Sequence, residues 1–197
     1  MFSERQAEII EKSIEIIANK GIQGLTIKNL SKEIGFSEPA IYRHFKSKSD
    51  ILIAILSTFE EMAEMMGEMM KNSDDVATDK LSYIFDKMIQ VFEATPALVS
   101  VIFAEEIFKN EDVLKNKIIG ILEKNEETIE GIMKEGQAKG DIRDDLTYQN
   151  LALIVMGSLR LLVKRWDLGG HQFPLKKEGM ALTLSLKNIL SSSVLVR

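Results

Sequence analysis

Apolar residues recur at every third or fourth position over most of this chain. The clearest run is "LIAILSTFEEMAEMMGEMM", in which Leu52, Ile55, Phe59, Met62 and Met66 would share one face of a helix. This spacing is typical of an amphipathic helix, whereas a half-buried strand would alternate at every second position. The 197 residues include only three prolines, so few positions would interrupt such helices. The sequence therefore predicts an all-α protein.

Capping residues and glycines divide this pattern into nine predicted helices. Serine and threonine favour the position before a helix, because their side-chain oxygens accept hydrogen bonds from free N–H groups of the first turn. Glycine favours the position after a helix, where the backbone often becomes left-handed. The predicted helices cover approximately residues 3–21, 26–35, 37–45, 47–70, 78–92, 95–109, 112–139, 147–166 and 175–190.

The segment "GFSEPAIYRHFKSK", residues 35–48, is basic although the chain as a whole is acidic. The net charge is −5, yet residues 26–48 carry five basic and two acidic side chains. A local basic patch lets an acidic protein meet a polyanion. Taken alone, such a cluster is more often a solvated face. The surrounding helices decide between these readings.

The two predicted helices around residues 35–37 have the arrangement of a helix-turn-helix. In this motif the second helix enters the DNA major groove by its N-terminal end. Phe36, Ile41 and Phe45 would bury the opposite side of that helix. The predicted DNA-binding residues are Thr26, Lys28, Ser37, Glu38, Pro39, Ala40, Tyr42, Arg43, His44 and Lys48.

Each type of side chain in this set suits a part of the duplex. Pro39 and Ala40 are small or flat enough to approach base edges. Arg43 can form two hydrogen bonds to guanine, and Glu38 can accept one from cytosine. Tyr42, His44 and Lys48 are predicted to contact phosphate oxygens, which fix the register without reading sequence.

The stretch "GLTIKNLSKEIGFSEPAIYRHFKSKSDIL" resembles the DNA-binding signature of the TetR family of bacterial transcriptional regulators. The resemblance covers residues 5–56, and "EGQAKGDIRDDL" before the eighth predicted helix is also similar to many members. Glu38 departs from the family pattern and leaves the base preference open. The matching positions are Thr26, Gly35, Ser37, Ile41, Tyr42, Phe45, Ser47 and Lys48.

This resemblance implies how the protein is organised and what it binds. It implies a DNA-binding domain at residues 1–47, followed by an effector-binding and dimerisation domain at residues 48–197. It also implies a homodimer that binds double-stranded DNA at a palindromic operator, most simply as a repressor released by a small effector.

A methionine cluster at the end of the fourth predicted helix is a candidate wall for the effector pocket. Methionine lines adaptable sites, although such stripes are more often plain core. The candidate residues carry no charge, which favours a hydrophobic or amphipathic small molecule. The predicted pocket residues are Met62, Met66, Phe85, Met88, Phe92, Phe103, Ile118 and Leu122.

The last two predicted helices carry wide apolar faces. Periodicity alone fits either a dimer interface or the internal core of a monomer, and the resemblance favours the dimer. Small residues there would allow close helix packing. The predicted interface residues are Leu151, Ile154, Gly157, Ser158, Leu182, Ser185 and Ile189.

The composition argues against several other classes. The chain has no cysteine and only two distant histidines, so we expect no metal site and no cofactor. It has no glycine-rich phosphate loop and no catalytic triad order, so we expect no enzyme. Without a signal peptide or an apolar stretch of about 18 residues, we expect a cytoplasmic protein without a membrane partner. Two alternatives remain: a helical small-molecule carrier without DNA binding, and a regulator that answers to a protein partner.

Overall fold

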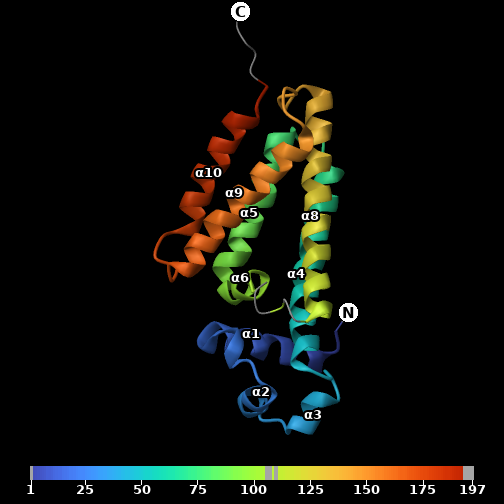
Figure 1. Ribbon diagram of the computed structural model, residues 1–197, viewed down its shortest axis with the longest axis vertical. Helices are drawn as coiled ribbons and strands as arrows, with labels where there is room; N and C mark the ends of the chain where they lie inside the picture. Colours follow the sequence, from blue (N-terminus) through green and yellow to red (C-terminus); the bar gives the residue numbers. More distant parts are fainter. Residues whose placement is uncertain (1, 105–107, 109–110, 193–197) are drawn as a thin grey trace, which may run out of the picture. The chain divides into compact units, whose positions relative to one another are not determined.

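The computed structural model describes residues 2–104, 108 and 111–192, and the regular elements within that part are all α-helices (Figure 1). This confirms the predicted all-α fold with an N-terminal helix-turn-helix and a C-terminal helical part. The helices are α1 (Glu4–Gly24), α2 (Ile27–Ile34), α3 (Glu38–Tyr42), α4 (Lys48–Lys71), α5 (Ala77–Ala94), α6 (Pro96–Ile102), α8 (Asp112–Lys139), α9 (Tyr148–Leu168) and α10 (Leu175–Leu190).

Predicted caps form hydrogen bonds at several of these boundaries, whereas Ser37 before α3 and Thr95 before α6 make no side-chain capping bond. Ser3 and Gln6 form a capping box at the start of α1, in which each side chain bonds the backbone N–H of the other. The Thr26 hydroxyl accepts from the Asn29 N–H at 3.1 Å, and the Thr147 hydroxyl accepts from the Asn150 N–H at 3.3 Å. Local hydrogen bonds at the chain's own polar residues therefore start α1, α2 and α9.

Three helix ends differ from the prediction. Gly21 interrupts α1 with a φ of 67°, but one further helical turn carries the element to Gly24. The short α3 ends at Tyr42, so His44 lies beyond it. Helix α6 ends at Ile102, because Phe103 has a non-helical backbone. The predicted end of that helix, Lys109, lies outside the described residues.

Contacts between residues divide the chain into two compact units. Unit 1 comprises residues 1–61 and 95–120, and unit 2 comprises residues 62–94 and 121–197. In unit 1, α1 packs against both α2 and α6. The predicted boundary after residue 47 falls inside unit 1. The first turns of α4 belong to this unit, and their side chains Ile51, Leu52 and Ile55 are buried.

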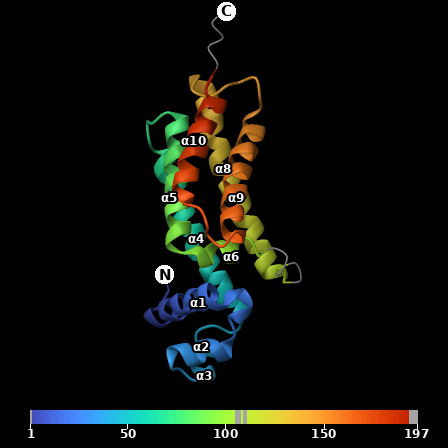
Figure 2. The same ribbon diagram turned by 90° about the vertical axis from the view of Figure 1, so that its left-hand side faces the viewer.

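Unit 2 is built around α5, α9 and α10. Figure 2 shows α10 beside α5 and α9, and the packing of their residues agrees. The core of this unit also takes side chains from the ends of α4 and α8. Its buried residues are Met70, Ala77, Leu81, Phe85, Ile129, Ile132, Met133, Ile142, Leu151, Ala152, Val155, Leu186 and Leu190.

One glycine of α8 lies where two parts of unit 2 meet closely. A Cβ atom on Gly136 would lie 2.6 Å from the Ala77 Cβ and 2.5 Å from the Ile142 Cγ1. By contrast, a Cβ on Gly120 or Gly131 would meet nothing within 4 Å. Close approach therefore requires glycine at position 136, whereas Gly120 and Gly131 only weaken the helix.

Two alanine substitutions on α8 should thus act in opposite directions. We expect Gly131→Ala to raise the free energy of unfolding by up to about 1 kcal/mol, because alanine favours helix. Gly136→Ala should lower it by about 1–3 kcal/mol, because the new methyl group overpacks the core. Urea denaturation of both variants measures the difference. Equal effects in the two variants would contradict the close packing at position 136.

Candidate nucleic-acid interface

The turn between α2 and α3 is fixed by hydrogen bonds of its own residues. Gly35 is left-handed, with a φ of 80°, and its N–H donates to the Ser31 carbonyl at 3.0 Å. The Ser31 hydroxyl donates to the Phe36 carbonyl at 2.5 Å. At the other end of α2, the Asn29 amide donates to the Gly24 carbonyl at 2.8 Å. The sequence thereby sets the angle at which α3 leaves α2.

Three apolar side chains anchor this segment to the core of unit 1. Leu30, Ile41 and Phe45 are buried, as their predicted helical faces require. Phe36 was predicted to be buried as well but is only half-buried. Its ring is covered instead by the Arg5 guanidinium, whose carbon lies 5.2 Å from the ring centre. A cation–π contact thus replaces the expected core position.

With this side buried, the predicted DNA-binding residues are left mainly on the surface. Tyr42 is 48% exposed although it follows the fully buried Ile41. Within the predicted set, Ala40, His44 and Lys48 are half-buried. The exposed members are Thr26, Lys28, Ser37, Glu38, Pro39, Tyr42 and Arg43.

An acidic side chain near this surface is neutralised within the chain. The Glu33 carboxylate of α2 lies 2.9 Å from the Lys20 ammonium of α1. The hydrogen bond from Lys20 lowers the pKa of Glu33 below its ordinary value. The pair therefore joins α1 to α2 and reduces the repulsion that Glu33 would exert on a phosphate.

The start of α4 carries a cap and a lysine with an internal partner. The Ser47 hydroxyl accepts from the Asp50 N–H at 3.1 Å, and the Asp50 carboxylate accepts from the Lys46 N–H at 2.9 Å. The Lys48 ammonium donates to the Ile22 carbonyl near the end of α1 at 2.9 Å. Burial lowers the pKa of Lys48. A phosphate contact by this ammonium would have to share or replace its bond to Ile22.

A carboxylate that sequence reasoning missed also meets the first turn of α4. The Ser49 hydroxyl donates a hydrogen bond to the Glu111 carboxylate at the start of α8. Sixty-two residues separate the partners, and no local motif signals the contact. Glu111 also attracts the Lys48 ammonium.

The predicted effector residues are divided between the two units. Phe103 and Ile118 belong to unit 1, whereas the other six belong to unit 2. Met66, Phe85, Met88, Phe92 and Ile118 are buried, and the remaining members, Met62, Phe103 and Leu122, are half-buried.

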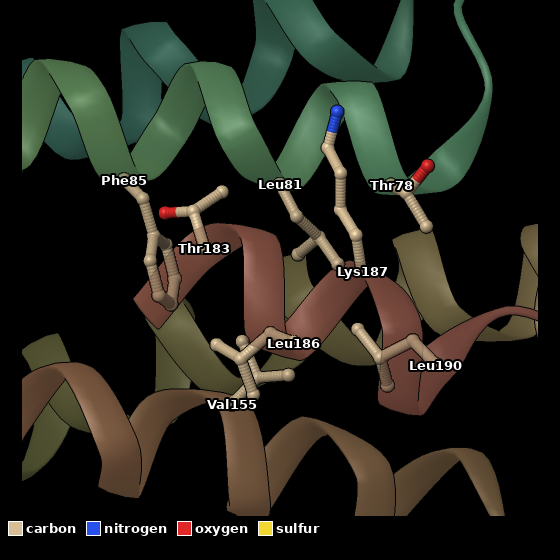
Figure 3. A pocket seen from close by; sticks show the side chains of 8 residues that line it. All are labelled: Thr78, Leu81, Phe85, Val155, Thr183, Leu186, Lys187 and Leu190. Carbon is tan, nitrogen blue, oxygen red and sulfur yellow. The ribbon is translucent and has the colours of Figure 1, made fainter. Parts of the chain in front are cut away.

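A small cavity lies in unit 2 among α5, α9 and α10 (Figure 3). Its volume of about 10 Å³ is close to the space that one water molecule needs. Of the predicted pocket residues, only Phe85 lines it. Its walls are formed by Thr78, Leu81, Phe85, Val155, Thr183, Leu186, Lys187 and Leu190.

The outer faces of α9 and α10 carry large exposed apolar side chains. Of the predicted interface, Ile154, Gly157, Ser185 and Ile189 are exposed, while Ser158 and Leu182 are half-buried. Leu151 is 0% exposed and belongs to the core of unit 2, so it does not lie on the free face. The exposed apolar residues that the prediction missed are Leu153, Leu161, Leu168, Met180 and Leu184.

Comparison with known proteins identifies similar chains. The family model for "Bacterial regulatory proteins, tetR family" matches residues 9–55, and that for "YsiA-like protein, C-terminal region" matches residues 57–186. The fatty acid metabolism regulator protein of Bacillus subtilis (strain 168) is 25% identical over 189 residues, which cover 95% of this chain and 94% of that protein.

Solved structures share the fold over nearly the whole chain. FadR from Bacillus subtilis, crystallised in complex with stearoyl-CoA, has a TM-score of 0.75 at 24% identity and covers 91% of this chain and 96% of its own. FadR from Bacillus halodurans has a TM-score of 0.82 at 19% identity and covers 100% of this chain and 99% of its own.

Two other kinds of feature, a membrane span and a metal site, are absent from the described residues. No helix there is long and apolar enough to cross a membrane. No group of three or more histidine, cysteine, aspartate or glutamate side chains in that part of the chain could hold a metal ion.

Arg43 is the exposed side chain best suited to read a base. We expect Arg43→Ala to cost about 1–3 kcal/mol of DNA-binding free energy and to relax preference at one position of the bound sequence. Arg43→Lys should keep the charge but lose the paired hydrogen bonds to guanine. Selection of bound sequences from a random duplex pool, repeated with each variant, measures both effects. An unchanged selected sequence with Arg43→Ala would remove Arg43 from the base-reading residues.

Proposed function

This chain belongs to the tetR family of bacterial regulatory proteins, and we propose that it represses transcription as a homodimer bound to a palindromic operator. We further propose that a long-chain acyl thioester releases it from DNA. In this proposal the protein acts by binding rather than by catalysis. The observation that carries it is the exposed polar face of α3 beside the buried Ile41 and Phe45.

Support for DNA binding comes from the shape and charge of this face. Helix α3 is five residues long and ends at Tyr42, so its exposed residues lie close together. Arg43, Lys46 and Lys28 add exposed positive charge around it. A helix presented in this way fits the major groove, while its flanking residues reach phosphates.

The proposed dimer rests on apolar side chains that the chain leaves exposed. On α9, Leu153 and Leu161 are each 62% exposed, and on α10 Leu184 is 63% exposed. Leu153 and Leu161 are eight residues apart on α9, which packs beside α10, so the exposed apolar side chains of the two helices can form one stripe. A surface of this kind suits the same surface of a second copy, which would give a two-fold dimer. A two-fold dimer in turn requires a near-palindromic operator.

The proposed effector class takes its starting point from a relative. FadR from Bacillus subtilis was solved with stearoyl-CoA, which combines a long apolar chain with an anionic nucleotide. In the present chain, the buried Met66, Met88 and Phe92 of unit 2 offer apolar, adaptable surroundings for such a chain. The cavity of about 10 Å³ is far too small for it, so an acyl chain among Met66, Met88 and Phe92 would have to open their packing.

Selection followed by displacement tests the whole proposal. The full-length protein is mixed with a random duplex pool, the bound DNA is sequenced, and the complex is titrated with stearoyl-CoA. Coenzyme A and free stearate serve as controls for the two halves of the ligand. We expect the selected DNA to be a near-palindrome. We expect stearoyl-CoA, but neither coenzyme A nor stearate, to release the protein from it. Failure to select any duplex would favour a carrier without DNA binding. DNA binding that resists all three compounds would favour a protein partner or another effector.

One charged substitution on the exposed stripe should disrupt the dimer. We expect Leu161→Glu to raise the dimer dissociation constant at least about a hundredfold, because each copy loses about 1.5–3 kcal/mol of apolar burial and gains a charge. Met65→Glu is the matched control, since Met65 is 61% exposed on α4, outside the stripe. Light scattering across a dilution series reports the masses. A dimer that persists in Leu161→Glu would place the interface elsewhere.

A bulky residue at the methionine cluster should change the response to the effector. We expect Met66→Trp to shift the stearoyl-CoA concentration that releases half of the DNA, with ligand-free DNA affinity nearly intact, because Met66 is buried in unit 2. Met65→Trp controls for the added ring on the exposed side of the same helix. Fluorescence anisotropy of labelled DNA follows both reactions. A folded Met66→Trp protein with a normal ligand response would place the effector away from this residue.

A further inference from the structure

The contact between Glu111 and the first turn of α4 lies at a sensitive position for DNA binding. The Ser49 hydroxyl bonds the Glu111 carboxylate, and the adjacent Lys48 ammonium is attracted to it. Lys48 is one of the predicted phosphate contacts. A negative charge from the start of α8 therefore lies at the first turn of α4 and attracts a side chain that is predicted to contact phosphate.

The backbone of Glu111 is fixed on both sides. Its N–H donates to the Phe108 carbonyl at 2.9 Å, and its own carbonyl accepts from the Lys115 N–H at 3.0 Å. Phe108 is only 2% exposed, so the residue that accepts the Glu111 N–H is itself buried in unit 1. The Glu111 side chain thus starts from a fixed point and is directed to α4 rather than to its own helix.

Two other acids near the DNA-binding face, Asp50 and Glu33, have partners within their own part of the structure. Asp50 caps the start of α4 through the Lys46 N–H, and Glu33 pairs with Lys20. Glu111 instead comes from a segment remote in sequence and bonds a hydroxyl that needs no counter-charge. Lys48, which Glu111 attracts, and the positive end of α4 offset this negative charge.

Phosphate and carboxylate compete for the same features at such a place. The N-terminus of a helix favours anions, because its free N–H groups and its dipole point toward them. Lysine binds phosphate as a compact charge and loses part of that attraction when a carboxylate lies beside it. A carboxylate held at the start of α4 therefore weakens the binding of a DNA phosphate at the same helix end.

We propose that Glu111 is an intramolecular competitor of DNA phosphate at the start of α4, and that it holds the DNA affinity of the protein below the value that Lys48 and α4 would give without it. This rests on the proposed DNA-binding role of Lys48. Glu111 belongs to a different stretch of chain from α2 and α3. A shift of the start of α8 would therefore alter DNA affinity without changing any base-reading residue.

Neutralising the carboxylate tests this directly. Glu111→Gln has nearly the same size and can still accept the Ser49 hydrogen bond, but it carries no charge. Asp112→Asn is the matched control, because Asp112 is the exposed neighbour and the net charge changes equally. Both full-length variants are titrated with the duplex selected by the wild type, at several salt concentrations, after circular dichroism has confirmed the fold.

We expect Glu111→Gln to bind roughly two- to fivefold more tightly for each protomer on the DNA, the size of effect typical of a single charge–charge attraction at the surface. The salt dependence should become steeper by up to about 0.9 for each additional phosphate that the protein neutralises. Asp112→Asn should bind like the wild type. In a Lys48→Met background, Glu111→Gln should have little further effect, because its partner is gone.

Three results would overturn the inference while leaving the proposed function intact. Equal tightening by Glu111→Gln and Asp112→Asn would mean a general effect of net charge. Weaker binding by Glu111→Gln would mean that Glu111 supports the DNA-binding arrangement. A full increase in affinity that persists in the Lys48→Met background would exclude Lys48 as the competed group. A wild type that selects no duplex would refute the proposed function itself, and the competitor role with it.

Discussion

The DNA-binding face depends on the burial of three side chains, because its helices are too short to persist alone. Helix α2 has eight residues and α3 has five, whereas isolated helices below about 12–15 residues are marginal in water. Leu30, Ile41 and Phe45 supply the missing stabilisation, at about 1.5–3 kcal/mol for each fully buried side chain. Since burial fixes one side of α3, it also decides which polar residues face outward.

The charge that a phosphate would meet at this face depends on individual pairs of side chains rather than on the net charge of the chain. The chain is acidic overall, yet Lys20 neutralises Glu33, and the Lys48 ammonium bonds the Ile22 carbonyl and is attracted to Glu111. Short-range pairs of this kind matter more for a phosphate in contact than a net charge of −5 spread over the whole surface, because salt screens distant charges beyond about 8–10 Å.

The sequence predicted those features that local rules determine. The Thr26 cap, the left-handed Gly35 and the buried Ile41 follow from capping, turn chemistry and periodicity, and all three are present. Features that depend on distant contacts were missed. Periodicity groups residues on one face of a helix but does not tell which face the chain itself covers. Hence Leu151 was placed on the interface although it lies in the core, and Leu153 was overlooked.

The same reason explains the incomplete site predictions. The Glu111–Ser49 hydrogen bond joins residues 62 positions apart, and no motif encodes it. The cavity walls come from three helices, of which the sequence linked only α5 to a pocket. Helix lengths and caps can thus be derived one segment at a time, whereas pockets and hydrogen bonds between remote segments require the packing of several segments.

Hydroxyl-radical footprinting of the side chains, with and without the selected duplex, tests the central claim most directly. It reports the solvent exposure of individual residues in the full-length protein. DNA should strongly protect Tyr42, which is 48% exposed in the free chain, while Met65 and Met69 on α4 remain as reactive as before. Unchanged labelling of Tyr42 in a saturated DNA complex would contradict the assignment of α3 as the DNA-binding helix.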